Sequence, residues 1–256
     1  MRLICKGGWP AGLELEDKEA ALLSAAYMDK IINFDFSQID GVKRNPATMR
    51  RILRSLARNN ATESRISVLA NDVQEADQPL SQATAGGYLD VLKKMFIIEE
   101  QEPWLPDIRS KARQRRSPKR HFVDPSLAAA VLRLGYDAVF QDVETAGFLF
   151  ESLCYRDLCV YSAPFRGNVY HYRDSNGLEA DAVIEADDGK WAAIEMKLGY
   201  TKADAAAANL IRLKEKMVAG GAPEPVFLMV ICATAMISHV RKEDGVYVVP
   251  IGCLGP

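Results

Sequence analysis

The spacing of apolar residues predicts a run of amphipathic helices in the first part of the chain. Residues 45–58 place their apolar side chains on one helical stripe: Met49, Ile52, Leu53 and Leu56. Asn45 is a natural N-cap, and Pro46 suits the first helical position. Further helices are expected over residues 16–32 and 64–73, and a third begins at Ser81.

The helices from Asn45 onward predict a winged helix-turn-helix. Three helices are followed by the strand-like residues 96–104, and this order of elements is the outline of that motif. We therefore assign residues 43–108 to a winged-helix module. Residues 1–42 are interpreted as an N-terminal leader or linker helix, and residues 109–142 as a basic connector with a short helix that starts at Asp124 and Pro125.

The pattern changes to alternating helices and strands in the last part of the chain, residues 143–256. The expected elements are a long helix over 145–160, a strand over 169–173, a hairpin over 177–199, a helix ending at Gly220 and strands over 226–232 and 246–250. The order is αβββαβ with a late extra strand. The fold class is thus mixed α/β (α+β), with a mixed central sheet.

Composition narrows the functional classes only a little. The chain has 256 residues, 48% of them apolar, so it can bury sizeable cores. A net charge of −2 gives no overall attraction to nucleic acid, so a basic surface must be local. Five scattered cysteines indicate reduced thiols, and the longest apolar run, residues 226–237, is too short to span a bilayer. We expect a soluble, cytoplasmic protein with no membrane partner.

A strongly basic run occupies residues 109–120, and its seven cations are Arg109, Lys111, Arg113, Arg115, Arg116, Lys119 and Arg120. The run is expected to be too basic for burial, so it forms either a solvated loop or a strip that contacts phosphates. In the predicted recognition helix, Ser81, Gln82 and Thr84 lie near the N-terminus, where side chains reach bases or phosphates. All ten residues are candidate DNA contacts.

The hairpin carries charged residues where a sheet would favour valine. A three-residue turn at 187–189 would place Asp181 opposite Glu195 and Glu179 opposite Lys197. Three carboxylates and one ammonium would then share one patch. An exposed sheet face with a Glu179–Lys197 surface pair is the alternative interpretation.

Like charges on opposite strands destabilise a hairpin unless something neutralises them. A divalent cation does so, and Mg²⁺ prefers one or two carboxylates while also bridging to phosphate oxygens. A fourth carboxylate, Glu151, lies among apolar residues of the predicted helix over 145–160, where a carboxylate usually has a partner. The spacing therefore indicates a metal site that serves phosphodiester chemistry.

A helix with a glutamate followed by a hairpin with Asp and Glu-x-Lys resembles the PD-(D/E)XK nuclease core, the restriction-endonuclease-like fold. The resemblance implies that Glu151 is the helix acid, Asp181 the central metal-binding Asp, Glu195 the second acid and Lys197 the catalytic lysine. It also implies Mg²⁺ or Mn²⁺ as the cofactor. Ala180 replaces the usual proline, and the following helix offers Asn209 in place of a Gln-x-x-x-Tyr pattern.

More widely, the chain is similar to the C-terminal region of AAA-type ATP-binding proteins of bacteria and archaea. The similarity rests on "GGWP", "SPKRHFVDPSLAAAVL", "GFLFESLCYRDL", "YHYRDSNGLEADAVIE" and "WAAIEMKLG". It implies DNA and a separate or fused AAA-type ATPase as partners. The chain has no G-x-x-x-x-G-K-[ST] motif, so we expect no ATPase activity of its own.

Two functions follow from these features. The first is a Mg²⁺-dependent DNA nuclease in which Asp181 and Glu195 hold the ion, Lys197 stabilises charge, Glu151 binds a water or second ion, and Arg173 contacts a phosphate. The alternative is a catalytically lapsed nuclease fold that acts as a DNA-binding or partner-docking module.

Overall fold

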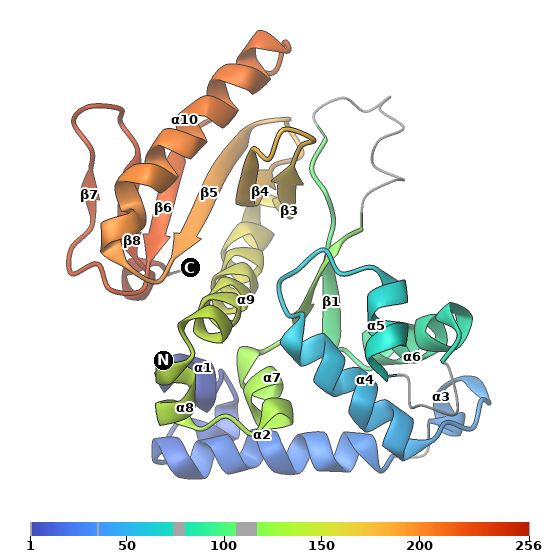
Figure 1. Ribbon diagram of the computed structural model, residues 1–256. Coiled ribbons are helices and arrows are strands. Elements are labelled where there is room, and N and C mark those ends of the chain that lie inside the picture. The colour runs from blue at the N-terminus through green and yellow to red at the C-terminus, as the bar shows by residue number, and fades with distance from the viewer. Residues whose placement is uncertain (1, 35, 74–79, 106–116, 256) are drawn as a thin grey trace. The chain divides into compact units, whose positions relative to one another are not determined.

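The structure is a computed structural model that describes all residues except 1, 35, 74–79, 106–116 and 256 (Figure 1). The chain divides into two compact units. Unit 1 contains Met1–Glu100 and Pro118–Ser152, and unit 2 contains Gln101–Ser117 and Leu153–Pro256. The protein is a mixed α+β protein, as predicted. No helix among the described residues is long and apolar enough to cross a bilayer.

Unit 1 is mainly helical. Its helices are α1 (Arg2–Lys6), α2 (Asp17–Ile32), α3 (Ser37–Asp40), α4 (Pro46–Arg58), α5 (Ile66–Val73), α6 (Gln82–Lys94), α7 (Pro125–Leu132) and α8 (Tyr136–Gln141). The strands β1 (Ile98–Gln101) and β2 (Lys119–Phe122) form a two-stranded sheet. The long helix α9 (Val143–Ser162) begins in unit 1 and continues into unit 2.

Two helices of unit 1 begin at the polar residues that the sequence predicts, α4 at Asn45 and α6 at Ser81. The Asn45 side chain accepts a hydrogen bond from the Ala47 N–H at 2.8 Å, and the Ser81 hydroxyl accepts one from Thr84 N–H at 3.0 Å. Each cap satisfies a backbone donor that the first helical turn leaves without a partner. These predicted helix starts are confirmed.

The N-terminal segment is built into unit 1 through the start of α7. The buried Asp124 carboxylate accepts hydrogen bonds from the N–H groups of Ser126 and Gly8, both at 2.9 Å. The Ser126 hydroxyl accepts from the Trp9 indole N–H at 3.0 Å and lies 2.8 Å from the Ser24 hydroxyl. Helices α1 and α2 both pack against α7. The "GGWP" and "SPKRHFVDPSLAAAVL" motifs therefore meet in one buried polar cluster.

The end of the basic run is not a solvated loop, contrary to the expectation that it is too basic for burial. Arg120 lies in β2 with 7% of its surface exposed, and its guanidinium donates to the Glu100 carboxylate at 2.9 Å and to the Ser64 carbonyl at 2.6 Å. Lys119 pairs with Glu151 at 2.5 Å. Burial of these cations is tolerated because each is paired. The other five cations of the run lie outside the described residues.

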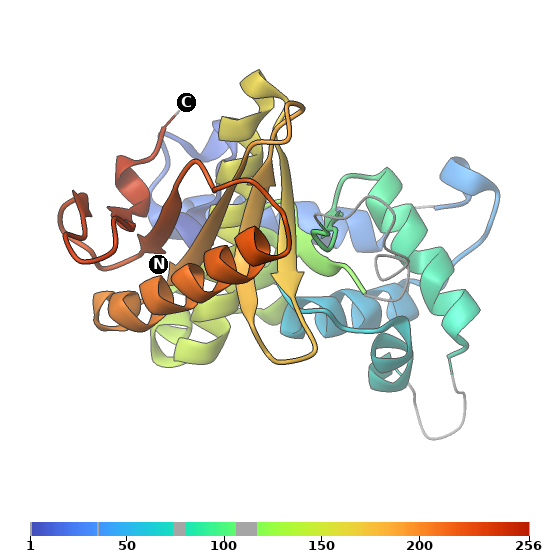
Figure 2. The same cartoon turned by 90° about the horizontal axis from the view of Figure 1, so that it is seen from above.

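Unit 2 is built on a six-stranded sheet. The strands are β3 (Asn168–Arg173), β4 (Glu179–Glu185), β5 (Trp191–Lys197), β6 (Leu228–Cys232), β7 (His239–Val240) and β8 (Tyr247–Pro250), and their order across the sheet is β3-β4-β5-β6-β8-β7. Pairs β5/β6 and β6/β8 are parallel and the others antiparallel, so the sheet is mixed. Figure 2 shows α10 (Ala203–Ala219) lying across the strands. Its apolar side chains share one core with strand residues such as Val183 and Ala193.

The β4–β5 hairpin has the predicted register. The partners run from Ala182 with Ile194 to Glu185 with Trp191. Ala186 N–H donates to the Lys190 carbonyl at 2.9 Å, which leaves residues 187–189 as the turn. Gly189 has φ 77°, a left-handed conformation that glycine adopts without a side-chain clash. This register carries Asp181 and Glu195 toward the same end of the hairpin.

Candidate functional site

Three of the four predicted catalytic residues meet in unit 2. Asp181 lies in β4, and Glu195 and Lys197 lie in β5. The Lys197 ammonium is 3.0 Å from Asp181 Oδ2 and 2.5 Å from Glu195 Oε2. The two acids are only 8% and 3% exposed. One partly buried ammonium therefore contacts two buried carboxylates.

Neighbouring groups hold both carboxylates in place. The backbone N–H of Met196 donates to Asp181 Oδ2 at 2.7 Å, across the hairpin. On α10, the Asn209 amide donates at 2.7 Å both to Glu195 Oε1 and to the Glu179 carbonyl. The buried Gln101 amide donates to the Asp181 carbonyl at 3.0 Å. These bonds fix the acids before any ligand binds, as a preorganised site requires.

The sequence pattern assigns no site role to Asn209 or Gln101. Asn209 does carry a signal, since it is a polar residue between Ala207 and Leu210, which are both buried. Gln101 ends β1 and binds β3 and β4 through backbone carbonyls, so its contact depends on a pairing between segments far apart in sequence. Spacing along the chain cannot reveal that pairing.

The burial of the acids changes their protonation. Burial is the largest cause that raises the pKa of Glu195, and repulsion from Asp181 raises it further. Lys197 lowers this pKa in part, and the resulting pKa is about 8. For Lys197, burial lowers the pKa, but attraction to Asp181 and Glu195 outweighs burial and the pKa is raised. Near neutral pH the cluster therefore holds a protonated Glu195 beside a charged ammonium. Ionisation of Glu195 becomes favourable when another cation is present.

The prediction that three carboxylates share one patch is wrong for Glu179. Glu179 is 53% exposed on its side chain and lies 3.9 Å from the Arg173 guanidinium, not beside Lys197. Its position at the start of β4 lets it reach β3 and solvent. The Glu179–Lys197 surface pair of the alternative interpretation is also absent, because Lys197 binds the two buried acids. Among the described residues, no group of three or more His, Cys, Asp or Glu side chains is placed to hold a metal ion.

Glu151, the predicted helix acid, has a partner within unit 1. It lies on α9 and pairs with the Lys119 ammonium at 2.5 Å, and both side chains are mostly buried. Asp181, Glu195 and Lys197 belong to unit 2. The expectation that a carboxylate in this apolar helix has a partner is confirmed, whereas its role beside the other three residues stays a prediction.

The predicted DNA contacts occupy several environments. The Ser81 and Thr84 hydroxyls bond to each other at 2.8 Å at the start of α6, and Gln82 is exposed beside them. Arg173 is half-exposed at the end of β3. Lys119 and Arg120 are held by acids, and Arg109, Lys111, Arg113, Arg115 and Arg116 lie outside the described residues. Their role in DNA binding stays a prediction.

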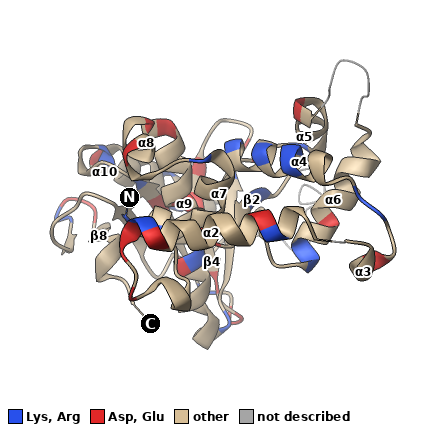
Figure 3. Cartoon of the chain, turned by 90° about the horizontal axis from the view of Figure 1, so that it is seen from below, with Lys and Arg blue, Asp and Glu red and all other residues tan. Residues whose placement is uncertain are grey.

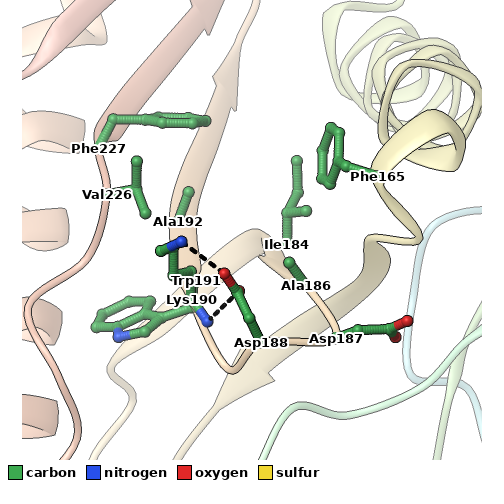
Figure 4. Close-up of a pocket in the computed structure, with 10 residues that line it drawn as sticks. All are labelled: Phe165, Ile184, Ala186, Asp187, Asp188, Lys190, Trp191, Ala192, Val226 and Phe227. Carbon is green, nitrogen blue, oxygen red and sulfur yellow. Dashed lines mark hydrogen bonds and ion pairs between the residues drawn. The ribbon is translucent and has the colours of Figure 1, made fainter.

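A hollow in unit 2 lies at the turn end of the same hairpin, away from Asp181 and Glu195. It has a volume of about 510 Å³ and is lined mainly by apolar side chains, among them Phe165, Ile184, Val226 and Phe227 (Figure 4). At its rim the Asp188 carboxylate accepts hydrogen bonds from the backbone N–H and the ammonium of Lys190. This hollow holds none of the candidate catalytic residues.

The two acids form a donor set that suits a hard divalent cation. Mg²⁺ takes oxygen ligands and is usually held by one or two carboxylates. With both acids ionised, Lys197 charged and a divalent ion present, the cluster would carry one net positive charge, which complements a singly charged phosphodiester. The residues therefore fit Mg²⁺ or Mn²⁺.

Comparison with known proteins places the chain in a family. A family model described as Domain of unknown function (DUF8612) matches residues 1–138, more than half of the chain. The chain belongs to the DUF8612 family. A second model, Domain of unknown function (DUF4143), matches residues 146–254, which include Asp181, Glu195 and Lys197. That domain is commonly the AAA-associated C-terminal region, in agreement with the expected resemblance. No curated protein and no solved structure matches the chain.

The raised pKa of Glu195 makes the stability of this DUF8612 protein depend on pH. In the unfolded chain Glu195 titrates near 4.5, and in the folded protein near 8, so folding takes up a proton between these values. Without divalent metal, stability should therefore fall as pH rises from about 4.5 to about 8, by on the order of 1 kcal/mol per pH unit. The free energy of unfolding, measured by urea titration at several pH values, should show this slope in the wild type and not in Glu195→Gln. The same pH dependence in both proteins would contradict the prediction.

Asn209 is expected to act by positioning Glu195. Asn209→Leu should weaken divalent-metal binding roughly tenfold or more, since it removes the amide that orients one carboxylate oxygen. Asn209→Gln offers the same donor on a longer side chain and should recover part of the affinity. Calorimetric titration with Mn²⁺ measures both. Equal affinities in Asn209→Leu and the wild type would show that the amide has no positioning role.

Proposed function

We propose that this protein is a Mg²⁺- or Mn²⁺-dependent DNA nuclease with Asp181, Glu195 and Lys197 as its catalytic centre. The observation that carries the proposal is the contact of one ammonium with two buried carboxylates from adjacent strands. Burial of two carboxyl groups side by side is costly to folding unless a proton or a cation neutralises them. Such an arrangement is typical of sites whose chemistry needs it.

In the proposed reaction, Asp181 and Glu195 would hold the cation. A bound Mg²⁺ or Mn²⁺ would supply charge neutralisation and lower the pKa of a water molecule. Lys197 stays protonated because its pKa is raised, and it donates hydrogen bonds to oxygens on which negative charge develops. Asn209 and Met196 N–H keep the two carboxylates oriented. The role of Glu151 as the helix acid stays a prediction.

The order of elements supports a restriction-endonuclease-like core. From α9 the chain runs helix, three strands, helix α10 and strand β6, with β5 and β6 parallel and α10 between them in sequence. In unit 1, α4, α5 and α6 pack against one another and precede the β1–β2 sheet. This arrangement supports the proposal of a winged helix in which α6 reads DNA.

Cleavage assays test this function directly. Supercoiled plasmid and end-labelled single- and double-stranded DNA should be cut in the presence of millimolar Mg²⁺ or Mn²⁺, and excess EDTA should stop the reaction. The rate should rise with pH toward about 8, because metal binding requires ionised Glu195. Absence of metal-dependent cleavage on every form of DNA would contradict the proposal.

A second candidate is a lapsed nuclease fold that binds DNA or a partner without cleavage. It is favoured by Lys197 itself, which already contacts both acids and gives the cluster a neutral state once Glu195 is protonated. This candidate predicts DNA binding that is unaffected by EDTA, together with no specific divalent site. The proposed nuclease predicts such a site.

A further inference from the structure

A second concentration of charge lies in unit 1, around a hollow between α2, α4 and α7. The hollow has a volume of about 130 Å³. Arg50 and Arg54 line it from α4, and Arg133 lines it from the C-terminal end of α7. Figure 3 shows basic residues along α4. Guanidinium groups from two helices thus share one concave site.

The floor of this hollow is apolar. It is formed by Met28 and Ile32 of α2, both buried, together with Ala130 and Val131 of α7. An apolar floor lowers the local dielectric and strengthens the attraction between the arginines and an anion. The one acid in the lining is Asp29, so the side chains around the hollow carry a net positive charge.

Among the described residues the three arginines have no acidic partner, unlike Arg44 and Arg120 of the same unit. Arg44 pairs with Asp40, and Arg120 pairs with Glu100. Within the described part of the chain, the side chains of Arg50, Arg54 and Arg133 make no hydrogen bond or ion pair. Their donors are therefore available to a ligand.

Arg133 occupies a backbone position that usually favours glycine. It caps the C-terminus of α7 with φ 57° and ψ 37°, the left-handed conformation. A residue with a side chain is uncommon there, and arginine gives this corner of the hollow a guanidinium. The position also offers a clean test, since glycine keeps the backbone conformation and removes the charge.

We infer that this hollow binds a phosphate group, held by Arg50, Arg54 and Arg133. Guanidinium groups bind phosphate oxygens through paired, charge-assisted hydrogen bonds, and several of them can surround one tetrahedral anion. The phosphate belongs either to a nucleic-acid backbone or to a free phosphate or phosphate ester. The inference is independent of the proposed cleavage, because the hollow lies in unit 1 and Asp181, Glu195 and Lys197 lie in unit 2.

Calorimetric titration of the full chain with inorganic phosphate, at low ionic strength and against matched chloride, tests this site. The wild type should bind phosphate, and Arg54→Gln and Arg133→Gly should each weaken binding roughly tenfold. Arg212→Gln, which removes an exposed charge from α10, should leave it unchanged. Arg133→Gly should unfold at the wild-type temperature or above, which separates loss of binding from loss of folding.

A second arm distinguishes the sources of phosphate. If the hollow takes a backbone phosphate, the same variants should weaken binding of a labelled duplex and lower the slope of log K against log salt by about 1 each. If it takes a free phosphate ester, they should weaken inorganic phosphate binding alone. If Arg54→Gln and Arg133→Gly bind both phosphate and duplex as tightly as Arg212→Gln does, the inference is overturned. This outcome does not depend on whether the protein cleaves DNA.

Discussion

Asp181→Asn should reduce metal-dependent DNA cleavage roughly a thousandfold or more, the equivalent of about 4 kcal/mol in the activation barrier. Asparagine keeps the size of the side chain and an oxygen that can accept from Met196 N–H. The substitution removes the negative charge that pairs with the Lys197 ammonium and that would bind a divalent ion. The variant should therefore fold but lose catalysis.

The same hairpin offers a matched control. Asp188 lies in the turn, half-exposed, and contacts Lys190. Asp188→Asn makes the same chemical change at the far end of the hairpin and should keep the wild-type rate. Initial rates on one DNA substrate at saturating metal compare the three proteins. Cleavage by Asp181→Asn within a few-fold of the wild type would place the chemistry elsewhere.

Lys197→Met should have the largest effect on stability. The ammonium is the cation that contacts both buried acids, so its removal leaves Asp181 and Glu195 with an uncompensated charge. Loss of one partner from a buried ion pair costs about 3 kcal/mol or more. The free energy of unfolding without metal should fall by this amount, and cleavage should also be lost.

Divalent metal should return part of that stability. Mn²⁺ should raise the melting temperature of Lys197→Met more than that of the wild type, because the ion replaces the missing positive charge. Lys190→Met removes an exposed lysine from the turn and should change stability by less than about 0.5 kcal/mol. An equal metal effect in Lys197→Met and Lys190→Met would contradict a shared metal site.

The hairpin and its register could be predicted because local rules determine them. Gly189 adopts the left-handed conformation that the turn needs, and successive side chains point to opposite faces of each strand. The turn alone therefore sets which residues face each other. Helix starts at Asn45 and Ser81 were predictable for the same reason: the capping residue lies beside the helix that it caps.

The remaining site features depend on contacts between distant segments. Asn209 reaches Glu195 because α10 packs on the sheet. Gln101, at the end of β1, reaches the carbonyl of Asp181 in β4. Strand β2 was missed because its charged residues Lys119 and Arg120 are buried only with partners far along the chain. Charge alone predicted exposure for both. Tertiary pairing reversed that prediction.

The proposed function depends on Asp181 and Glu195 forming one divalent-metal site. Titration with Mn²⁺ near pH 8, followed by electron paramagnetic resonance of the free ion, tests it without reference to DNA. We expect the wild type and Asp188→Asn to bind Mn²⁺ specifically at this site, and Asp181→Asn to lose this binding. Binding that is unchanged in Asp181→Asn, or no binding in the wild type, would contradict it.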